Sequence, residues 1–264
     1  MPGLLFWLPG IIVSEKDMRG ITLNCEVRIE NIGGGFQAEV TRDHSFGTDS
    51  YLLDWFASPK PNEQACDLGT GCGIIPLLWC RRQPALSVAA IEIQKKAVEL
   101  ARRSASRCGV EDRITVYHAD LRDWKEILGP NTQNLVAMNP PYFPAGSGEL
   151  SKSPAARIAR HEGEGCSFLD VANAAFGLLK QGGRFCFCHR PERLADVLEI
   201  LSQARLVPKR ILFAHHTPNS SPWLFLCEAR KGVSKGIKIL PPFIARDYDG
   251  NYTEDYKKVY DLER

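Results

Sequence analysis

Residues 64–73 read Gln-Ala-Cys-Asp-Leu-Gly-Thr-Gly-Cys-Gly, a mostly apolar run that passes into alternating glycines. The run predicts a buried strand, and the apolar residues 74–82 that follow predict a helix. Glycine has no Cβ, so the backbone at Gly69, Gly71 and Gly73 can turn tightly and approach a ligand closely. The stretch therefore predicts a strand, a binding loop and a helix, the opening unit of a parallel α/β sheet. A purely structural turn is the alternative.

The alternation of strand and helix continues through most of the chain. Strands are predicted at residues 64–68, 86–93, 114–118, 135–138, 184–188, 209–214 and 223–229. Helices are predicted at residues 50–57, 74–82, 94–108, 168–179 and 194–204, and Gly182-Gly183 is expected to stop the fourth of them. Seven strands with crossover helices predict an α/β fold, with a Rossmann-like, mostly parallel sheet and helices on both faces.

The pattern divides the chain into three regions. Residues 1–47 hold short alternating runs and predict a small β extension or lid, residues 48–232 form the α/β domain, and residues 233–264 predict an extended arm with one short closing helix. The apolar stretch 4–13 is interrupted by Pro9-Gly10 and lacks a basic leader. It is also shorter than the ~20 residues that span a bilayer. We therefore expect a cytoplasmic protein without a membrane segment.

Composition narrows the class of protein. The 264 residues carry a net charge of +2, which excludes a strongly basic nucleic-acid coat but permits a local basic patch. Nine cysteines occur without a CxxC pair, and several lie in predicted core strands: Cys66, Cys186, Cys188 and Cys227. Buried free thiols in a reducing compartment are the expected reading, with a zinc site as the alternative.

Acidic residues end the first three strands of the α/β domain. The carboxyl ends of parallel strands meet at one edge of the sheet, where ligands bind. Glu92 can accept hydrogen bonds from a ribose diol, and Asp120 can accept one from an adenine amino group. Asp67 can neutralise the cationic amino-acid end of S-adenosylmethionine (SAM), whereas it would repel the pyrophosphate of NAD. The set favours SAM, although each acid alone fits a helix cap or a solvated turn.

Asn139-Pro140-Pro141-Tyr142 ends the fourth strand. The prolines stiffen this turn, so the Asn139 side-chain oxygen and the Pro140 carbonyl can both accept from one planar NH₂ group. These two bonds would draw the nitrogen toward tetrahedral geometry and aim its lone pair at the methyl group, with no strong base needed. Tyr142 can stack on the acceptor ring. The motif predicts methylation of an exocyclic amine, with a strand-terminating turn as the alternative.

With these motifs, residues 48 to about 230 resemble the class I SAM-dependent methyltransferases. The resemblance implies that the glycine loop lines the methionine end and that the segment 46–49 packs over it. No metal is expected. The implied cofactor-binding residues are Thr48, Asp67, Gly69, Gly71, Gly73, Glu92, Asp120 and Asn139.

Three segments sharpen this resemblance: residues 46–53, 139–143 and 159–162 are similar to the tRNA adenine-N6 methyltransferase family, which modifies an anticodon-loop adenine of a valine tRNA. The N-terminal region and the tail depart from that family. The resemblance implies tRNA or another RNA as substrate, and no obligate protein partner is evident. It also implies catalytic roles for Asn139, Pro140 and Tyr142, and substrate-binding roles for Pro141, Phe143, Arg160 and His161.

Other functions remain open. A glutamine-amide methyltransferase uses the same planar NH₂ chemistry, but a larger helical N-terminal domain would be expected. A small-molecule O-methyltransferase would want a metal or a histidine base, for which His161 is the nearby candidate. An RNA-binding module with a degenerate SAM site is the non-enzymatic alternative.

Basic residues could supply phosphate contacts or simply be solvated helix charges. Those of the two helices after the glycine loop are Arg81, Arg82, Lys95, Lys96, Arg102, Arg103 and Arg107. Those that follow the acceptor motif are Lys152, Arg157 and Arg160.

Overall fold

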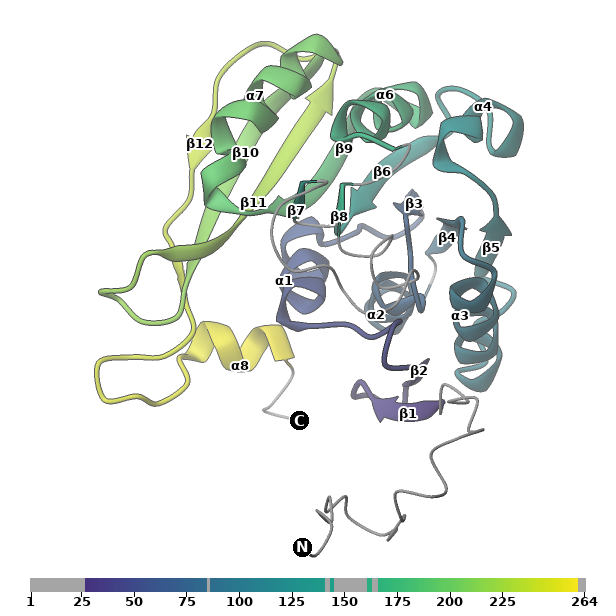
Figure 1. Ribbon diagram of the computed structural model, residues 1–264, viewed down its shortest axis with the longest axis horizontal. Coiled ribbons are helices and arrows are strands. Elements are labelled where there is room, and N and C mark those ends of the chain that lie inside the picture. Colours follow the sequence, from purple (N-terminus) through teal and green to yellow (C-terminus); the bar gives the residue numbers. More distant parts are fainter. Residues whose placement is uncertain (1–26, 85, 141–142, 145–160, 163–165, 261–264) are drawn as a thin grey trace, which may run out of the picture.

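The computed structural model describes residues 27–84, 86–140, 143–144, 161–162 and 166–260, in which strands and helices alternate (Figure 1). The strands are β1 Arg28–Asn31, β2 Gln37–Val40, β3 Gln64–Leu68, β4 Ser87–Glu92, β5 Ile114–His118, β6 Gln133–Met138, β7 Phe143–Pro144, β8 His161–Glu162, β9 Leu179–His189, β10 Leu206–His215, β11 Pro222–Lys231, β12 Lys238–Ile239 and β13 Phe243–Ile244. The helices are α1 Thr48–Ala57, α2 Ile74–Arg82, α3 Lys95–Arg107, α4 Trp124–Ile127, α6 Phe168–Leu178, α7 Leu194–Gln203 and α8 Glu254–Tyr260, with 3-10 turns η1 Leu121–Asp123 and η2 Pro191–Arg193.

The central sheet has the strand order β12-β10-β11-β9-β6-β3-β4-β5, and β13 also pairs with β10. Strands β9, β6, β3, β4 and β5 are mutually parallel, and β11 runs antiparallel to both β9 and β10. The seven predicted strands and the mostly parallel sheet are therefore confirmed. The C-terminal arm adds the two short strands β12 and β13 along β10, and the short closing helix is α8.

Helices cover both faces of the sheet (Figure 1). On one face α1, α2, α3 and α8 share a core with alternate strand residues such as Ala65, Leu135 and Cys188. On the other face α4, α6 and α7 share a core with the intervening residues, such as Cys66 and Val136. This alternation follows from the two-residue period of a strand, whose successive side chains point to opposite faces.

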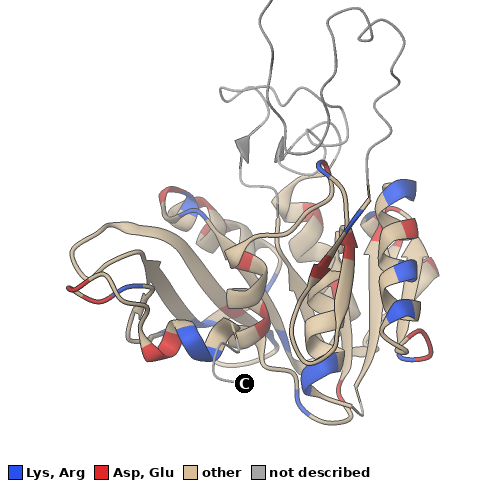
Figure 2. Ribbon diagram, turned by 90° about the horizontal axis from the view of Figure 1, so that it is seen from below, with Lys and Arg blue, Asp and Glu red and all other residues tan. Residues whose placement is uncertain are grey.

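The N-terminal hairpin of β1 and β2 is tied to α3. Glu39 accepts from Arg103 at 2.6 Å and from Arg107 at 2.8 Å, and its backbone N–H donates to the Ser104 hydroxyl at 2.8 Å. Figure 2 shows the basic residues along α3. Two of them, Arg103 and Arg107, hold the hairpin against this helix. Arg102 likewise donates to the Val116 carbonyl at 2.7 Å. Much of the predicted phosphate-contacting face thus consists of arginines that hold elements together.

The helix at 168–179 was predicted to be stopped by Gly182-Gly183, and this prediction is wrong. The helix α6 ends at Leu178, and β9 begins at the next residue, so Gly182-Gly183 lies inside a strand. The pairing of β6 with β9 jumps there, from Gln133 opposite Leu179 to Leu135 opposite Arg184. Gly182, with φ +77°, lies in the segment that this bulge leaves without parallel partners.

The cysteines of the core strands are buried free thiols, as predicted. Across the described ranges, no group of three or more His, Cys, Asp and Glu side chains could hold a metal ion. In the same ranges, no helix combines the length and the apolar character that crossing a bilayer requires.

Candidate active site

The acids and the Asn139 turn lie at the carboxyl edge of the parallel strands. Asp67 is next to last in β3 and pairs in register with Ala137 of β6, two residues before Asn139. Glu92 ends β4 opposite His118, the last residue of β5. The parallel topology therefore brings the cofactor and acceptor motifs to one edge of the sheet, as the sequence predicts.

The glycine loop is held by β4. The N–H groups of Gly69 and Thr70 donate to the Ile91 carbonyl at 2.8 and 3.1 Å. Glu92 accepts from Gly71 N–H at 2.9 Å with one carboxylate oxygen and from Gln94 N–H at 2.8 Å with the other. Glu92 thus joins the loop to the start of α3, while its remaining acceptor capacity is available for a ligand.

Two glycines of the loop serve different purposes. Both have positive φ, +57° at Gly71 and +84° at Gly73. A Cβ at Gly73 would lie 2.9 Å from the Cβ of Ala101 on α3, so this glycine allows α2 and α3 to pack closely. A Cβ at Gly71 would meet no atom within 4 Å, so this position faces open space. Gly71 is therefore the residue against which a ligand can lie.

Asp67 is a buried carboxylate that has no hydrogen-bond partner among the described residues. Its side chain is 1% exposed, and neither oxygen accepts a hydrogen bond from the described residues. Burial raises the pKa of Asp67 to about 7, and the Glu92 charge adds to the rise. The nearby Thr70 hydroxyl lowers the pKa somewhat, without standing in hydrogen-bond geometry. An unpaired buried acid is costly, and a cationic group such as the ammonium of SAM would offset that cost.

Asp120 has protein partners. One of its oxygens caps η1 by accepting from Arg122 N–H at 2.9 Å, and the Arg122 guanidinium donates to both oxygens. These hydrogen bonds hold the pKa of Asp120 below its usual value. Its predicted bond to an adenine amino group would have to be shared with Arg122, and the role stays a prediction.

The Asn139 side chain is oriented from two sides. Its Nδ2 donates to the Ser50 hydroxyl at 3.3 Å, and its Oδ1 accepts from the Cys188 thiol at 3.2 Å. Ser50 lies in the first turn of α1, which begins at the exposed Thr48. The acceptor motif is therefore in direct contact with the residue that follows the segment 46–49, which is predicted to cover the cofactor.

The remaining predicted residues are placed only in part. Phe143 of β7 and His161 of β8 are register partners in a short parallel pair, so two predicted substrate-binding residues become neighbours. Pro140 is buried at the end of β6. Pro141, Tyr142 and Arg160 lie outside the described residues, as do Lys152 and Arg157.

Sequence reasoning missed three residues at this edge. Ser50 and Cys188 contact Asn139 from elements far away in the chain, and no local pattern marks such contacts. Ile93 was assigned to the strand, but β4 ends at Glu92 and Ile93 is 52% exposed. An apolar residue directly after a strand-end acid was the available signal. It presents an apolar surface beside the acid predicted to bind ribose.

Comparison with known proteins supports the same chemistry. Residues 44–161 match the methyltransferase small domain family. A protein of Porphyromonas gingivalis named tRNA1(Val) (adenine(37)-N6)-methyltransferase is 30% identical over 190 residues, 70% of this chain and 73% of the relative. A ribosomal protein uL3 glutamine methyltransferase of Bradyrhizobium diazoefficiens is 29% identical over 70% of this chain and 58% of its own. The structure of a predicted O-methyltransferase from Agrobacterium tumefaciens shares the fold, with a TM-score of 0.67 and 22% identity over 81% of this chain and 96% of its own.

Proposed function

The chain belongs to the family of SAM-dependent methyltransferases that includes the tRNA1(Val) (adenine(37)-N6)-methyltransferases, and we propose that it methylates N6 of an adenine in tRNA. The observation that carries this proposal is the orientation of Asn139 at the edge where Asp67 and Glu92 also lie. An amide oriented in this way serves a planar NH₂ group, which adenine carries at C6. The relative in Porphyromonas gingivalis supports adenine and tRNA in particular.

The acceptor would be bound by two oxygens at the end of β6. A carbonyl oxygen has two lone pairs, so Asn139 Oδ1 can accept from the substrate amine while it accepts from Cys188. The Pro140 carbonyl would accept the second N–H of the amine. Both bonds strengthen as the nitrogen loses its planarity, so they favour the transition state over the bound substrate.

The cofactor end fits SAM. When bound, SAM supplies an electrophilic methyl group on a sulfonium. Asp67 would pair with its ammonium group, since this buried carboxylate lacks a partner in the described protein. Glu92 would accept from the ribose hydroxyls while it still holds Gly71 N–H. The open space over Gly71 leaves room for the ligand backbone.

A second candidate substrate is a glutamine side-chain amide. The relative that methylates a glutamine of ribosomal protein uL3 supports it, and the amide is also a planar NH₂ group. The two substrates differ in what surrounds the nitrogen. An adenine needs a splayed base and an RNA backbone, whereas a glutamine needs a peptide groove.

Labelled methyl transfer separates these candidates. Purified enzyme would be incubated with tritiated SAM and, in parallel, bulk tRNA, total ribosomal protein or small phenols. We expect label in the tRNA sample. Label only in the protein sample would replace the proposal with glutamine methylation, and label only in phenols would point to O-methylation.

A further inference from the structure

A cavity of about 140 Å³ opens at the amino edge of the sheet, opposite the candidate active site. Its lining includes Lys60, Glu63, Asn134, Gly182, Arg184 and Arg230. These residues lie at the starts of β3 and β6, in the β9 bulge and at the end of the antiparallel β11. The strands separate this cavity from the glycine loop by about 15–20 Å. It is therefore distinct from the site described above.

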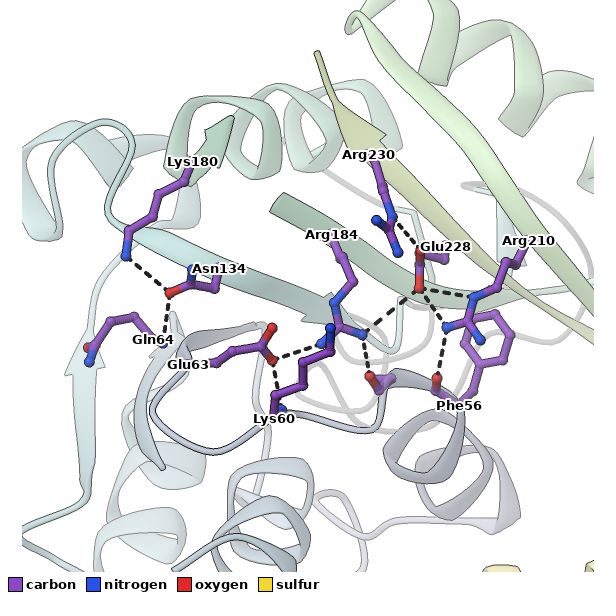
Figure 3. Close-up of polar contacts among 11 residues, drawn as sticks. Phe56, Lys60, Glu63, Gln64, Asn134, Lys180, Arg184, Arg210, Glu228 and Arg230 are labelled. Atoms are coloured by element: carbon purple, nitrogen blue, oxygen red, sulfur yellow. Dashed lines mark hydrogen bonds and ion pairs between the residues drawn. The ribbon is translucent and has the colours of Figure 1, made fainter. Parts of the chain in front are cut away.

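Arginines gather beside this cavity around one buried carboxylate (Figure 3). Glu228, 1% exposed, accepts from Arg210 at 2.5 Å and from Arg230 at 2.6 Å. Burial raises the pKa of Glu228, but the hydrogen bonds from these two arginines outweigh it and leave the pKa below its usual value. Glu228 is therefore ionised, and it neutralises one of the surrounding positive charges.

Arg184 brings in the second carboxylate of the cluster. It donates to Glu63 at 2.8 Å and to the Ala57 carbonyl at 2.7 Å, and it lies 3.9 Å from Glu228. In the antiparallel pairing, Arg184 stands directly opposite Arg230. Like charges at such a position are destabilising unless an anion lies between or beside them.

Positive charge exceeds negative charge in this cluster. The cations are Lys60, Arg184, Arg210 and Arg230, and the carboxylates are Glu63 and Glu228. Four positive and two negative charges leave a local excess of two. Among the lining residues alone, Lys60, Arg184 and Arg230 face the single carboxylate of Glu63, so the cavity wall attracts an anion.

Donors without acceptors line the cavity. Within the described protein, the Lys60 ammonium makes no hydrogen bond, and Arg230 uses only Nε, which donates to Glu228. The Arg184 side chain is 8% exposed, yet its Nε has no acceptor among the described residues. A Cβ at Gly182 would meet no atom within 4 Å, so the backbone of the bulge is also open to a ligand.

We propose that this cavity binds a phosphate group, either as free phosphate or as part of a polynucleotide backbone. Lysine and arginine donors around one space are the usual partners of a phosphate oxyanion. At about 30 Å³ per water, a volume of 140 Å³ corresponds to a few waters, which a compact tetrahedral anion can replace. Binding of a polynucleotide phosphate rests on the proposed function, in which RNA is the substrate, whereas binding of free phosphate does not.

The direct test is calorimetric titration of the full chain with inorganic phosphate, compared with sodium chloride at equal ionic strength. The Lys60→Glu variant removes one donor and adds a negative charge to the wall. Lys60 is exposed and only its backbone N–H bonds the protein, so the variant is expected to fold, as thermal melting will check. We expect its phosphate affinity to fall at least tenfold, whereas Lys235→Glu, an exposed control outside the cavity, changes it less than twofold.

The second arm identifies the source of the phosphate. If tRNA supplies it, Lys60→Glu weakens tRNA binding and lowers the salt slope of that binding by about one, with kcat unchanged. Unaltered tRNA binding together with lost phosphate binding assigns the cavity to the free anion. Equal phosphate affinity in the wild type and Lys60→Glu, or no phosphate binding to the wild type, overturns the proposal. Neither phosphate result depends on whether tRNA is methylated, so failure of the proposed function is a separate outcome.

Discussion

The Cys188 thiol donates to the side-chain oxygen of Asn139 at 3.2 Å, across the pair of strands β6 and β9. A primary amide can rotate by half a turn without changing its shape, so a donor on one side and an acceptor on the other must fix its direction. Cys188 is the donor and the Ser50 hydroxyl is the acceptor. These two residues therefore position Asn139 for its proposed role, although neither has to touch the substrate.

Loss of the thiol should slow turnover. Cys188→Ala removes a neutral hydrogen bond of about 1 kcal/mol, which corresponds to roughly a fivefold lower kcat. Cys188→Ser keeps a donor and should retain most of the activity. Cys186→Ala is the matched control, because Cys186 is equally buried on the same strand and face. Steady-state kinetics decide the point, and equal kcat losses in the two alanine variants would contradict a positioning role.

SAM binding should depend on the ionisation of Asp67. Its pKa of about 7 means that the carboxyl is largely protonated in the free protein at pH 6. Binding to a cationic ligand needs the ionised form, so the Kd for SAM should be about tenfold higher at pH 6 than at pH 8. Calorimetry across this range gives the profile. Asp67→Asn should bind SAM weakly with little pH dependence, and an unaltered profile in this variant would refute the assignment.

Asp67 should also make the stability of the ligand-free protein depend on pH. The folded pKa of Asp67, about 7, is above its ordinary value of 3.8, so between these values the folded protein binds more protons than the unfolded chain. The contribution of Asp67 to the free energy of unfolding therefore declines as pH rises through this window. Denaturant melts of Asp67→Asn should lack that part of the decline.

Alanine substitutions at Gly71 and Gly73 should separate binding from packing. Both substitutions force alanine into a positive φ, which lowers the free energy of unfolding by about 1–3 kcal/mol. Gly73→Ala also drives a Cβ against Ala101, which adds roughly 1–3 kcal/mol of destabilisation. Gly71→Ala should melt closer to the wild type but lose SAM affinity. Thermal melting and calorimetry measure the two effects, and the reverse order of the melting temperatures would argue against this assignment of roles.

Glu92→Gln should weaken SAM binding through the loop and the ribose together. The carboxylate accepts from Gly71 N–H and Gln94 N–H, and an amide can accept from only one of them. Hydrogen bonds to a charged group contribute about 1.5–3 kcal/mol, so the Kd should rise roughly 10- to 100-fold. A Kd within twofold of the wild type would show that Glu92 serves only the loop.

Much of this architecture could be predicted because the information is local. The apolar runs mark the seven strands, and the glycines after β3 mark the loop, since each signal depends on residues close in the chain. The bulge of β9 and the two short strands of the arm could not be predicted, because pairing with distant strands creates them. The contacts of Ser50 and Cys188 with Asn139 belong to the same class.

The positions of charged residues could also be predicted better than their long-range contacts. The acids at the strand ends could be placed by topology, but their partners could not. Asp120 already binds Arg122, whereas Asp67 is left without a partner in the described protein. From the sequence alone, the arginines of α3 could contact phosphate or remain solvated, yet Arg103 and Arg107 bind Glu39 of the hairpin. A local excess of positive charge lies around Glu228, where no sequence motif pointed.

We propose that Asn139 presents an adenine amino group of tRNA to the methyl group of SAM. The most direct test of this proposal is nucleoside analysis of unmodified tRNA after incubation with SAM and either the wild type or Asn139→Ala. We expect N6-methyladenosine with the wild type, and a loss of methylation of at least about 10²-fold in the variant at nearly unchanged SAM affinity. A wild type that leaves the tRNA adenines unmethylated, or an Asn139→Ala variant with full activity, would contradict it.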